Sequence, residues 1–252
     1  MLNLYGDGGN VQCLGKRLMW RGIGAEVKKI PAGDAVDFSG LDLVLLGGGS
    51  DREQEIACRY LQKEREDFRA YVEDGGVVLA ICGGYQLLGS YYKTRQATIK
   101  GLHILDMDTE WAPGRLTGNI LLESPLSPNL VVGFENHGGR TRIGSHTPFG
   151  RVVRGHGNDD SSGREGVLYK NLIGTYLHGP LLPKNPEICD YLLARALERK
   201  YGTNIRLEPL NDGQERQANG YMVRRMKSWL AGTGRICYTA YRTDCRKEGT
   251  VS

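Results

Sequence analysis

Residues 75–89, GGVVLAICGGYQLLG, decide the fold of this chain and point to its chemistry. The apolar run at 77–81 predicts a buried strand that leads straight into Cys82, and the glycine pair behind it predicts a sharp turn into a helix. A thiol is thereby placed at the carboxyl end of a strand, against a helix N-terminus whose dipole and free N–H groups favour the thiolate. This arrangement is the cysteine version of the nucleophile elbow.

A simpler interpretation of the same stretch is available. A cysteine after an apolar run is often a small buried hydrophobe, and two glycines after a strand can form an ordinary turn. We favour a nucleophile at Cys82 because the strand, the cysteine, the glycine pair and the helix occur together as one unit.

Strand and helix signals alternate through the first half of the chain, as a parallel sheet requires. The expected strands there are 1–5, 25–30 and 41–46, and the expected helices are 11–21 and 54–73. From 101 to 150, short strand-like pieces at 120–123 and 130–135 indicate an antiparallel or loop-rich extension. Behind it we expect an exposed hairpin loop at 155–166, strands at 167–170 and 172–177, and a closing helix at 186–200.

These signals predict an α/β protein with an open, mostly parallel sheet flanked by helices and a small antiparallel extension. We assign residues 1–200 to one domain and residues 201–252 to a C-terminal extension. After about Arg225 this extension is unusual: residues 231–235, AGTGR, break any helix, and residues 239–252 have no clear periodicity, so we expect its final part to be poorly ordered.

Composition excludes several classes of function. The chain has a net charge of +4, but residues 221–252 alone carry +5 and residues 1–220 carry −1, so a nucleic-acid partner is not expected. There is no apolar run of about 18 residues, and the N-terminus does not resemble a signal peptide, so we expect a cytoplasmic protein without a membrane span. None of the six cysteines forms a C-x-x-C pair, and no metal site is expected.

A cysteine nucleophile needs a base, and the chain offers five histidines. Of these candidates, His178 follows an apolar strand at its carboxyl end, where functional residues of open α/β sheets collect. A histidine before Gly-Pro can also be a satisfied loop residue. We expect His178 to be the base of Cys82. The other histidines are at 103, 137, 146 and 156.

A second glycine-rich turn, residues 47–50, follows the expected strand at 41–46. The N–H groups of Gly48 and Gly49, together with that of Gly83, are candidate donors to an oxyanion. A phosphate-binding loop is the rival interpretation, but no Lys-Ser or Lys-Thr follows as a Walker motif requires. The polar turn at 7–10 is expected at the same sheet edge, where it could contact a partner.

Three stretches carry a family resemblance: DLVLLGGG (42–49), AICGGYQLLG (80–89) and GTYLHGP (174–180). They resemble the class I glutamine amidotransferases, which have a flavodoxin-like fold, and GFENH (133–137) is similar to the cobyric-acid-synthase-like branch. Within that branch, NLYGDGGN (3–10) and FENHGGRT (134–141) are similar to the GatD family of glutaminase subunits of lipid II isoglutaminyl synthase. The resemblance covers about residues 2–200.

The resemblance implies that glutamine is hydrolysed to glutamate and ammonia, with Cys82 as nucleophile and His178 as general base. The ammonia passes to a MurT-like partner of the Mur-ligase family, which amidates the α-carboxyl of D-glutamate in the lipid II stem peptide. ATP and Mg²⁺ are then expected on that partner, with no cofactor on this chain. Arg115 matches the position of an arginine that binds the substrate glutamine, and a guanidinium suits an α-carboxylate.

One position departs from the class I pattern. Many members carry a Glu two residues after the histidine, where this chain has Pro180. The resemblance to GatD implies that the partner supplies the orienting acid, while Glu135 is an in-chain alternative with Asn136 beside it as a possible supporting residue. On this basis we expect the isolated subunit to be a poor glutaminase that its partner activates.

Two rival functions remain at this point. One is a different enzyme, either an amidotransferase of the cobyric-acid type or a stand-alone cysteine hydrolase; the start of the fold near Met1 favours a separate subunit over a fused enzyme. The other is a non-catalytic regulatory subunit of the same fold, which the presence of Cys82, His178 and both glycine turns disfavours.

Overall fold

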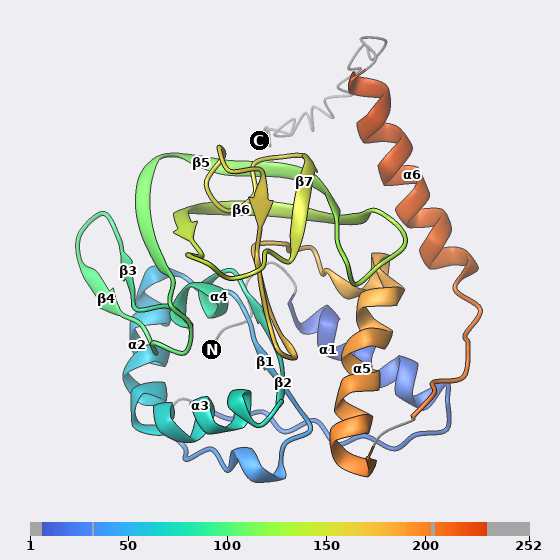
Figure 1. The fold of residues 1–252 in the computed structure, drawn as a ribbon, viewed down its shortest axis with the longest axis horizontal. Helices are drawn as coiled ribbons and strands as arrows, with labels where there is room; N and C mark the ends of the chain where they lie inside the picture. Colours follow the sequence, from blue (N-terminus) through green and yellow to red (C-terminus); the bar gives the residue numbers. More distant parts are fainter. Residues whose placement is uncertain (1–6, 32, 203–204, 231–252) are drawn as a thin grey trace, which may run out of the picture.

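The computed structural model describes residues 7–31, 33–202 and 205–230, which form two sheets surrounded by helices (Figure 1). In chain order the elements are α1 (Gly8–Met19), η2 (Phe38–Gly40), β1 (Leu43–Leu46), α2 (Asp51–Leu61), η3 (Gln62–Glu64), α3 (Arg65–Glu73), β2 (Val77–Ile81), α4 (Gly83–Leu87), β3 (Tyr91–Lys93), β4 (Thr98–Lys100), β5 (Asp108–Glu123), β6 (Val131–Arg142), β7 (Gly150–Arg154), β8 (Arg164–Glu165), β9 (Val167–Tyr169), β10 (Leu172–Thr175), η4 (Leu182–Lys184), α5 (Pro186–Tyr201) and α6 (Gly213–Leu230).

The first sheet confirms the expected α/β architecture. Its strand order is β1-β2-β10-β9, in which β1, β2 and β10 are parallel and β9 is an antiparallel edge. Every residue of the central strand β2 is buried, as its continuous apolar sequence predicts. Helices α2 and α3 lie on one side of this sheet and α1 and α5 on the other (Figure 1).

The second sheet is larger than the small antiparallel extension that the sequence suggested. Its order is β4-β3-β5-β7-β8, with β6 also paired to β5, and all of these pairings except β3 with β5 are antiparallel. The glycine and proline residues near position 113 led us to expect short strands. Instead β5 runs for 16 residues, because a register shift between Trp111 and Leu116 absorbs the interruption without ending the strand.

Helix boundaries follow their capping residues more closely than their apolar periodicity. Helix α2 starts at Asp51 because Ser50 and Glu53 form a capping box, in which the Ser50 side chain accepts from the Glu53 N–H and the Glu53 carboxylate accepts from the Ser50 N–H. The single helix expected at 54–73 is therefore longer at its start and divided into α2, η3 and α3. Helix α1 likewise starts at Gly8, earlier than the expected residue 11.

Two other expectations need correction. Residues 25–30 form no strand in the described structure: Val27 and Ile30 are exposed, and no neighbouring strand pairs with them. The loop at 155–166 is partly buried, because the Asn158 side chain accepts from the Gly166 N–H and donates to the Gly166 carbonyl. Helix α6 ends at Leu230, directly before the stretch at 231–235 that was expected to break any helix. The strand expected at 1–5 and the final part of the extension lie outside the described residues.

Helix α6 packs on the outer surface of the second sheet. Its Met226 is buried in a small apolar cluster with Leu121 of β5 and Val132 of β6. The Asn219 amide also donates to the carbonyls of Leu130 and Lys184. Over the described part of the chain, no helix is long and apolar enough to cross a membrane.

The turn after β2 packs directly against the end of β1. The Gly84 N–H donates to the Gly47 carbonyl at 3.1 Å, and a Cβ on Gly84 would lie only 2.5 Å from the Leu46 carbonyl oxygen. A backbone atom cannot move aside as a flexible side chain can. Glycine is therefore required at position 84 by close approach.

The Gly84→Ala variant is expected to lower the free energy of unfolding by about 1–3 kcal/mol, because the added methyl group overpacks against backbone. Gly15→Ala is the matched control: it lies inside α1 and a Cβ there meets nothing within 4 Å. This control should be neutral or stabilising by up to about 1 kcal/mol, since alanine is the better helix former. Chemical denaturation of both variants measures the two free energies of unfolding. Equal values for Gly84→Ala and Gly15→Ala would contradict this packing of the turn against β1.

Candidate active site

Cys82 lies on a strained turn between β2 and α4. Its backbone has φ +50° and ψ −104°, a conformation that costs a non-glycine residue on the order of 1–3 kcal/mol. Backbone hydrogen bonds hold it there, since the Cys82 N–H donates to the Thr175 carbonyl at 2.8 Å and the Gln86 N–H donates to the Cys82 carbonyl at 2.9 Å. The strand, turn and helix expected around Cys82 are thus present.

His178 lies at the same sheet edge as Cys82. Strand β10 pairs in parallel with β2, with Thr175 opposite Ile81, so the chain segments leaving both strands emerge side by side. The His178 N–H donates to the Phe134 carbonyl at 2.7 Å, which ties this segment to β6. Its fully buried imidazole lies near the Cys82 side chain, since both border the space beside Gly48, and Cys82 helps to raise the pKa of His178. The structure brings together the two residues that the sequence nominated.

Asp7 is a third member of this cluster that the sequence analysis did not identify as catalytic. Its fully buried carboxylate places Oδ1 3.3 Å from Nδ1 of His178, while Oδ2 accepts from the Gly48 N–H at 2.7 Å. Burial lowers the pKa of His178, but hydrogen bonds to Asp7 and Cys82 outweigh burial and raise it to about 9. The imidazole is therefore held in its charged form, next to the thiol.

The packing of α1 explains how Asp7 reaches the histidine. Asp7 directly precedes the first residue of α1, and a Cβ on Gly9 would lie 2.6 Å from Cγ of Pro180. The Asn10 side chain also accepts from the Leu182 N–H at 2.9 Å. Pro180, at the position where many class I members carry the acid, instead supports the helix that delivers a carboxylate from elsewhere in the chain.

Asp7 also changes the interpretation of the glycine turn at 47–50. Gly48 lies against the site, since a Cβ there would be 3.1 Å from Cε1 of His178 and 3.5 Å from Cβ of Cys82. Its N–H, which we expected to be free for an oxyanion, is bonded to Asp7. To stabilise an oxyanion, the Gly48 N–H has to leave the carboxylate.

Gln54 links the two glycine turns, and the sequence analysis missed it. This buried residue of α2 donates from Nε2 to the Gly49 carbonyl at 3.1 Å, and its side chain fills the space where a Cβ on Gly83 would lie. Among the described residues its Oε1 has no hydrogen-bond partner. Gln54 therefore sets the spacing between the predicted oxyanion donors Gly49 and Gly83.

Arg115 is held by Asn136 across the β5–β6 pair. Its Nε donates to Oδ1 of Asn136 at 2.8 Å, and its Nη2 donates to the Asn136 carbonyl at 2.9 Å. The Arg115 charge also acts on the Tyr92 hydroxyl, lowering its pKa against the larger effect of burial, which raises it. The remaining N–H groups of the guanidinium suit a carboxylate ligand.

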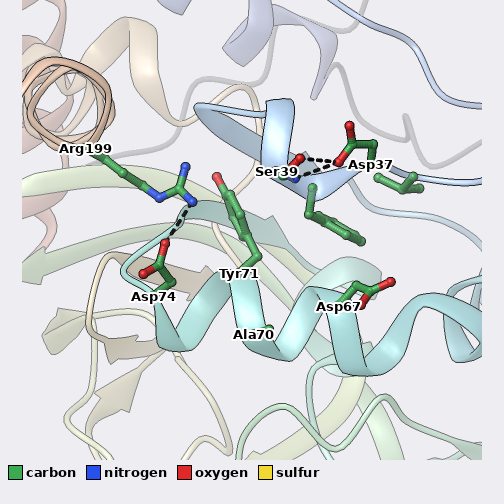
Figure 2. Close-up of a pocket in the computed structure, with 9 residues that line it drawn as sticks. Asp37, Ser39, Asp67, Ala70, Tyr71, Asp74 and Arg199 are labelled. Carbon is green, nitrogen blue, oxygen red and sulfur yellow. Dashed lines mark hydrogen bonds and ion pairs between the residues drawn. The ribbon is translucent and has the colours of Figure 1, made fainter.

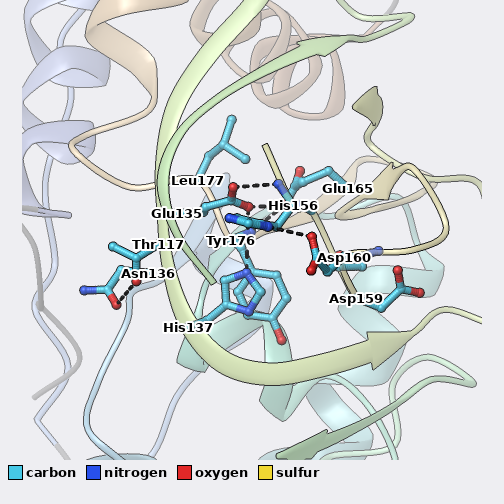
Figure 3. Close-up of polar contacts among 12 residues, drawn as sticks. Thr117, Glu135, Asn136, His137, His156, Asp159, Asp160, Glu165, Tyr176 and Leu177 are labelled. Atoms are coloured by element: carbon cyan, nitrogen blue, oxygen red, sulfur yellow. Dashed lines mark hydrogen bonds and ion pairs between the residues drawn. The ribbon is translucent and has the colours of Figure 1, made fainter. Parts of the chain in front are cut away.

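Glu135 does not supply the acid that we considered as an alternative. Its fully buried carboxylate accepts from the backbone N–H groups of His156 and Gly157, at 2.8 and 2.9 Å, as Figure 3 shows in part. These bonds anchor the loop beside β6. The structure places Asp7, not Glu135, at Nδ1 of His178.

His137 is held in a separate stack beneath the site. Its ring lies parallel to Tyr176, with centroids 3.5 Å apart, and its Nδ1 donates to the Gly139 carbonyl at 2.8 Å (Figure 3). Burial lowers the pKa of His137, so the ring is neutral. Glu165 binds the Tyr176 N–H at 2.7 Å, and burial raises the pKa of this carboxyl to about 8. Both residues position the segment that leads to His178.

One surface hollow lies away from this cluster. It has a volume of about 500 Å³ and is found at the opposite edge of the first sheet, where Asp74 shortly precedes the start of β2 (Figure 2). Arg199 is paired there with Asp74 at 3.1 Å and lies over the Tyr71 ring. The residues that line this hollow do not include Cys82, His178 or Asp7.

Comparison with known proteins supports the fold and shows the family. A solved structure described as a glutamine amidotransferase matches with a TM-score of 0.50 and 22% sequence identity, over 77% of this chain and 96% of that chain. Residues 1–186 match the model of the CobB/CobQ-like glutamine amidotransferase domain. The chain belongs to this family.

Its relatives include two subunits with a defined reaction. The chain is 46% identical to the GatD subunit of lipid II isoglutaminyl synthase (glutamine-hydrolysing) from Staphylococcus aureus, over 89% of this chain and 91% of that protein. It is 38% identical to the subunit of the same name from Streptococcus pneumoniae, over 84% and 83%. Cobyric acid synthase from Listeria innocua is 32% identical but shares only 29% of its own length with this chain.

The Asp7→Asn variant tests the role of the carboxylate. We expect glutamine turnover to fall by about 10²–10⁴-fold, as when the orienting acid of a triad is removed. The pKa of His178 should fall from about 9 toward its ordinary value, as measured by NMR titration of the imidazole.

Stability should follow the same titration. Because the folded-state pKa of His178 is raised, the Asp7–His178 contact stabilises the fold fully below about pH 6.5 and loses this effect as the pH rises through about 9. The stability difference between wild type and Asp7→Asn should shrink over that range. Asp160→Asn, which removes an exposed Asp–His contact, is the matched control. An unchanged His178 titration in Asp7→Asn would contradict the assignment.

Proposed function

We propose that this chain is the glutaminase subunit of a lipid II isoglutaminyl synthase. It hydrolyses L-glutamine and delivers ammonia to a MurT-type ligase, which amidates the α-carboxyl of D-glutamate in the lipid II stem peptide. ATP and Mg²⁺ belong to the ligase, and the two subunits form a heterodimer. The reaction takes place in the cytoplasm, where glutamine and ATP are available.

The observation that carries the proposal is the cluster of Cys82, His178 and Asp7 around Gly48, in which Oδ1 of Asp7 lies 3.3 Å from Nδ1 of His178. A thiol, a base and an orienting acid in this order are the parts of a cysteine nucleophile. The 46% identity to a glutamine-hydrolysing subunit over nearly its whole length supports glutamine as the substrate and lipid II as the final acceptor.

The first half of the reaction forms a thioester. In the resting site His178 holds the proton shared with Cys82, in keeping with its pKa of about 9. The Cys82 thiolate attacks the side-chain amide carbon of glutamine while Arg115 binds the α-carboxylate. Backbone N–H groups of the glycine turns stabilise the tetrahedral oxyanion. His178 then donates its proton to the leaving ammonia.

The second half releases glutamate. His178 acts again as base, removing a proton from the water that attacks the γ-glutamyl thioester. The Asp7 carboxylate keeps Nδ1 of the imidazole protonated, so Nε2 is the nitrogen that exchanges protons in both halves.

Activation by the partner now has a different physical basis from the one first expected. The chain does supply an acid at His178, so a missing acid cannot explain a weak isolated subunit. Instead, the Gly48 N–H is bonded to Asp7 and is withheld from the oxyanion. A partner that releases this N–H raises the glutaminase rate without adding a catalytic group.

Two alternatives to the lipid II reaction are disfavoured. An amidotransferase for a cobyric-acid-type acceptor shares the family but aligns with only 57% of this chain, which favours the lipid II reaction. A non-catalytic regulatory subunit would not need the strained backbone of Cys82, which is costly to maintain unless it is used.

The Arg115→Ala variant should raise the KM for glutamine by about 10-fold or more, since a charge-assisted pair to a carboxylate is worth about 1.5–3 kcal/mol. Alkylation of Cys82 by iodoacetamide should be unchanged, because that small reagent has no α-carboxylate. Arg151→Ala, which removes another exposed arginine of the second sheet, is the control. An unchanged KM in Arg115→Ala would remove Arg115 from the substrate site.

The partner itself can be tested by co-expression with a Mur-ligase-family protein. We expect a stable complex that amidates lipid II with glutamine as nitrogen donor and hydrolyses glutamine at least about 10-fold faster than the isolated chain. With Cys82→Ala, glutamine-dependent amidation should be lost while amidation with free ammonia persists. Full turnover by the isolated chain, unchanged in the complex, would contradict partner activation.

A further inference from the structure

Two cysteines meet between helices α1 and α5, outside the candidate active site. Cys13 of α1 and Cys189 of α5 are both free thiols, and their Sγ atoms lie 3.8 Å apart although 176 residues separate them in the sequence. Figure 1 shows the two helices side by side. Neither thiol has a part in the glutaminase chemistry described above.

An ion-pair cluster fixes this approach of the two helices. Arg17, one turn after Cys13, forms a two-pronged pair with Asp190, with Nε and Nη2 at 2.7 and 2.6 Å from its two carboxylate oxygens. Arg21, one turn further along α1, binds the same carboxylate. Arg17 is only 1% exposed, so this pair is screened little by solvent. Because Asp190 directly follows Cys189, the Arg17–Asp190 ion pair keeps the Sγ atoms of Cys13 and Cys189 close to each other.

The two thiols differ in accessibility and in proton affinity. Cys13 is half-buried and lines a hollow of about 330 Å³, whereas Cys189 is fully buried. The hydrogen bond between the two sulfurs lowers the pKa of Cys13 against the opposing effect of burial, and the Arg17 guanidinium adds to this. The contact with Cys13 and burial raise the pKa of Cys189. Cys13 is therefore the more accessible and more readily ionised sulfur, which an oxidant meets first, and Cys189 lies behind it.

We propose that Cys13 and Cys189 form a reversible redox site that hydroperoxides convert to a disulfide between α1 and α5. The Cys13 thiolate attacks one oxygen of the hydroperoxide, so that an S–O bond forms, the O–O bond breaks and an alcohol leaves after protonation; with hydrogen peroxide, water leaves. The Cys189 sulfur then attacks the Cys13 sulfenic acid. The S–S bond forms, the S–O bond breaks, and the hydroxyl group departs as water with the Cys189 proton.

The geometry allows this bond with a small movement. A disulfide requires the sulfurs to approach to about 2.05 Å, so closure needs a displacement of about 2 Å from their present contact. Cys189 lies in the core, so α1, which has an exposed face carrying Met19 and Trp20, is the element that moves. Since Asp7 immediately precedes α1, the bond ties the segment that carries the active-site carboxylate to α5.

The other described cysteines give an internal comparison. Cys58 is buried, with its Sγ 2.8 Å from the Lys100 carbonyl, and burial raises its pKa. It has neither an accessible face nor a thiol partner, so it should stay reduced. Cys82 should also react with peroxide, but peptide mapping separates its products from those of Cys13.

The test is to treat the full chain with about one equivalent of hydrogen peroxide, and then to map thiols and disulfides by differential alkylation and mass spectrometry. We expect a Cys13–Cys189 linked peptide that a dithiol reductant abolishes, in wild type and in the Cys58→Ser control. In Cys189→Ser, a dimedone adduct of sulfenic acid should accumulate on Cys13. Amide hydrogen exchange in α1 should slow in the oxidised wild type and not in Cys13→Ser.

Three results would overturn the proposal. They are free thiols at 13 and 189 after Cys82 has been oxidised, a disulfide from Cys13 to any other cysteine, or over-oxidation of Cys13 in wild type without a linked peptide. Because peptide mapping needs no turnover, these outcomes do not depend on whether the chain is a glutaminase.

Discussion

The candidate site depends on the contacts that the buried carboxylate of Asp7 makes. It lies against Nδ1 of His178 on one side and accepts from the Gly48 N–H on the other, so it joins the start of α1 to the ends of two strands of the first sheet. A buried carboxylate without such partners would be costly, and here the charged imidazole and a backbone donor satisfy it. The same contact holds the histidine ready for chemistry and occupies a donor that the chemistry needs. The carboxylate that orients His178 is therefore the same one that withholds the Gly48 N–H.

Four consecutive residues of strand β6 support the region around this contact, each through a different interaction. The backbone of Phe134 holds that of His178, and the Glu135 carboxylate anchors the loop at 156–157. Asn136 fixes the Arg115 guanidinium, and His137 stacks on Tyr176. Alternate residues of a strand face opposite sides, so the side chains of Glu135 and His137 are buried on one face of β6 while Asn136 holds Arg115 on the other.

Local sequence patterns predicted the parts of this site that lie within one element. The strand before Cys82, the turn after it and the position of His178 after a parallel strand all follow from apolar runs, glycines and the common edge of a parallel sheet. Asp7 could not be predicted as the orienting acid, because its contact with His178 spans 171 residues and depends on how α1 packs against Pro180. The expected strand at 25–30 was wrong for a related reason: among the described residues no strand pairs with its apolar residues, and local sequence does not reveal which segments will be neighbours.

The central claim is that Cys82, prepared by His178 and Asp7, is a nucleophile toward glutamine. Reaction of the chain with 6-diazo-5-oxo-norleucine, a glutamine analogue that alkylates such nucleophiles, tests it most directly, with the ligase partner present and the product located by peptide mass spectrometry. The account predicts one adduct, on Cys82, which excess glutamine prevents. Absence of an adduct on Cys82, or labelling that glutamine does not suppress, would contradict it.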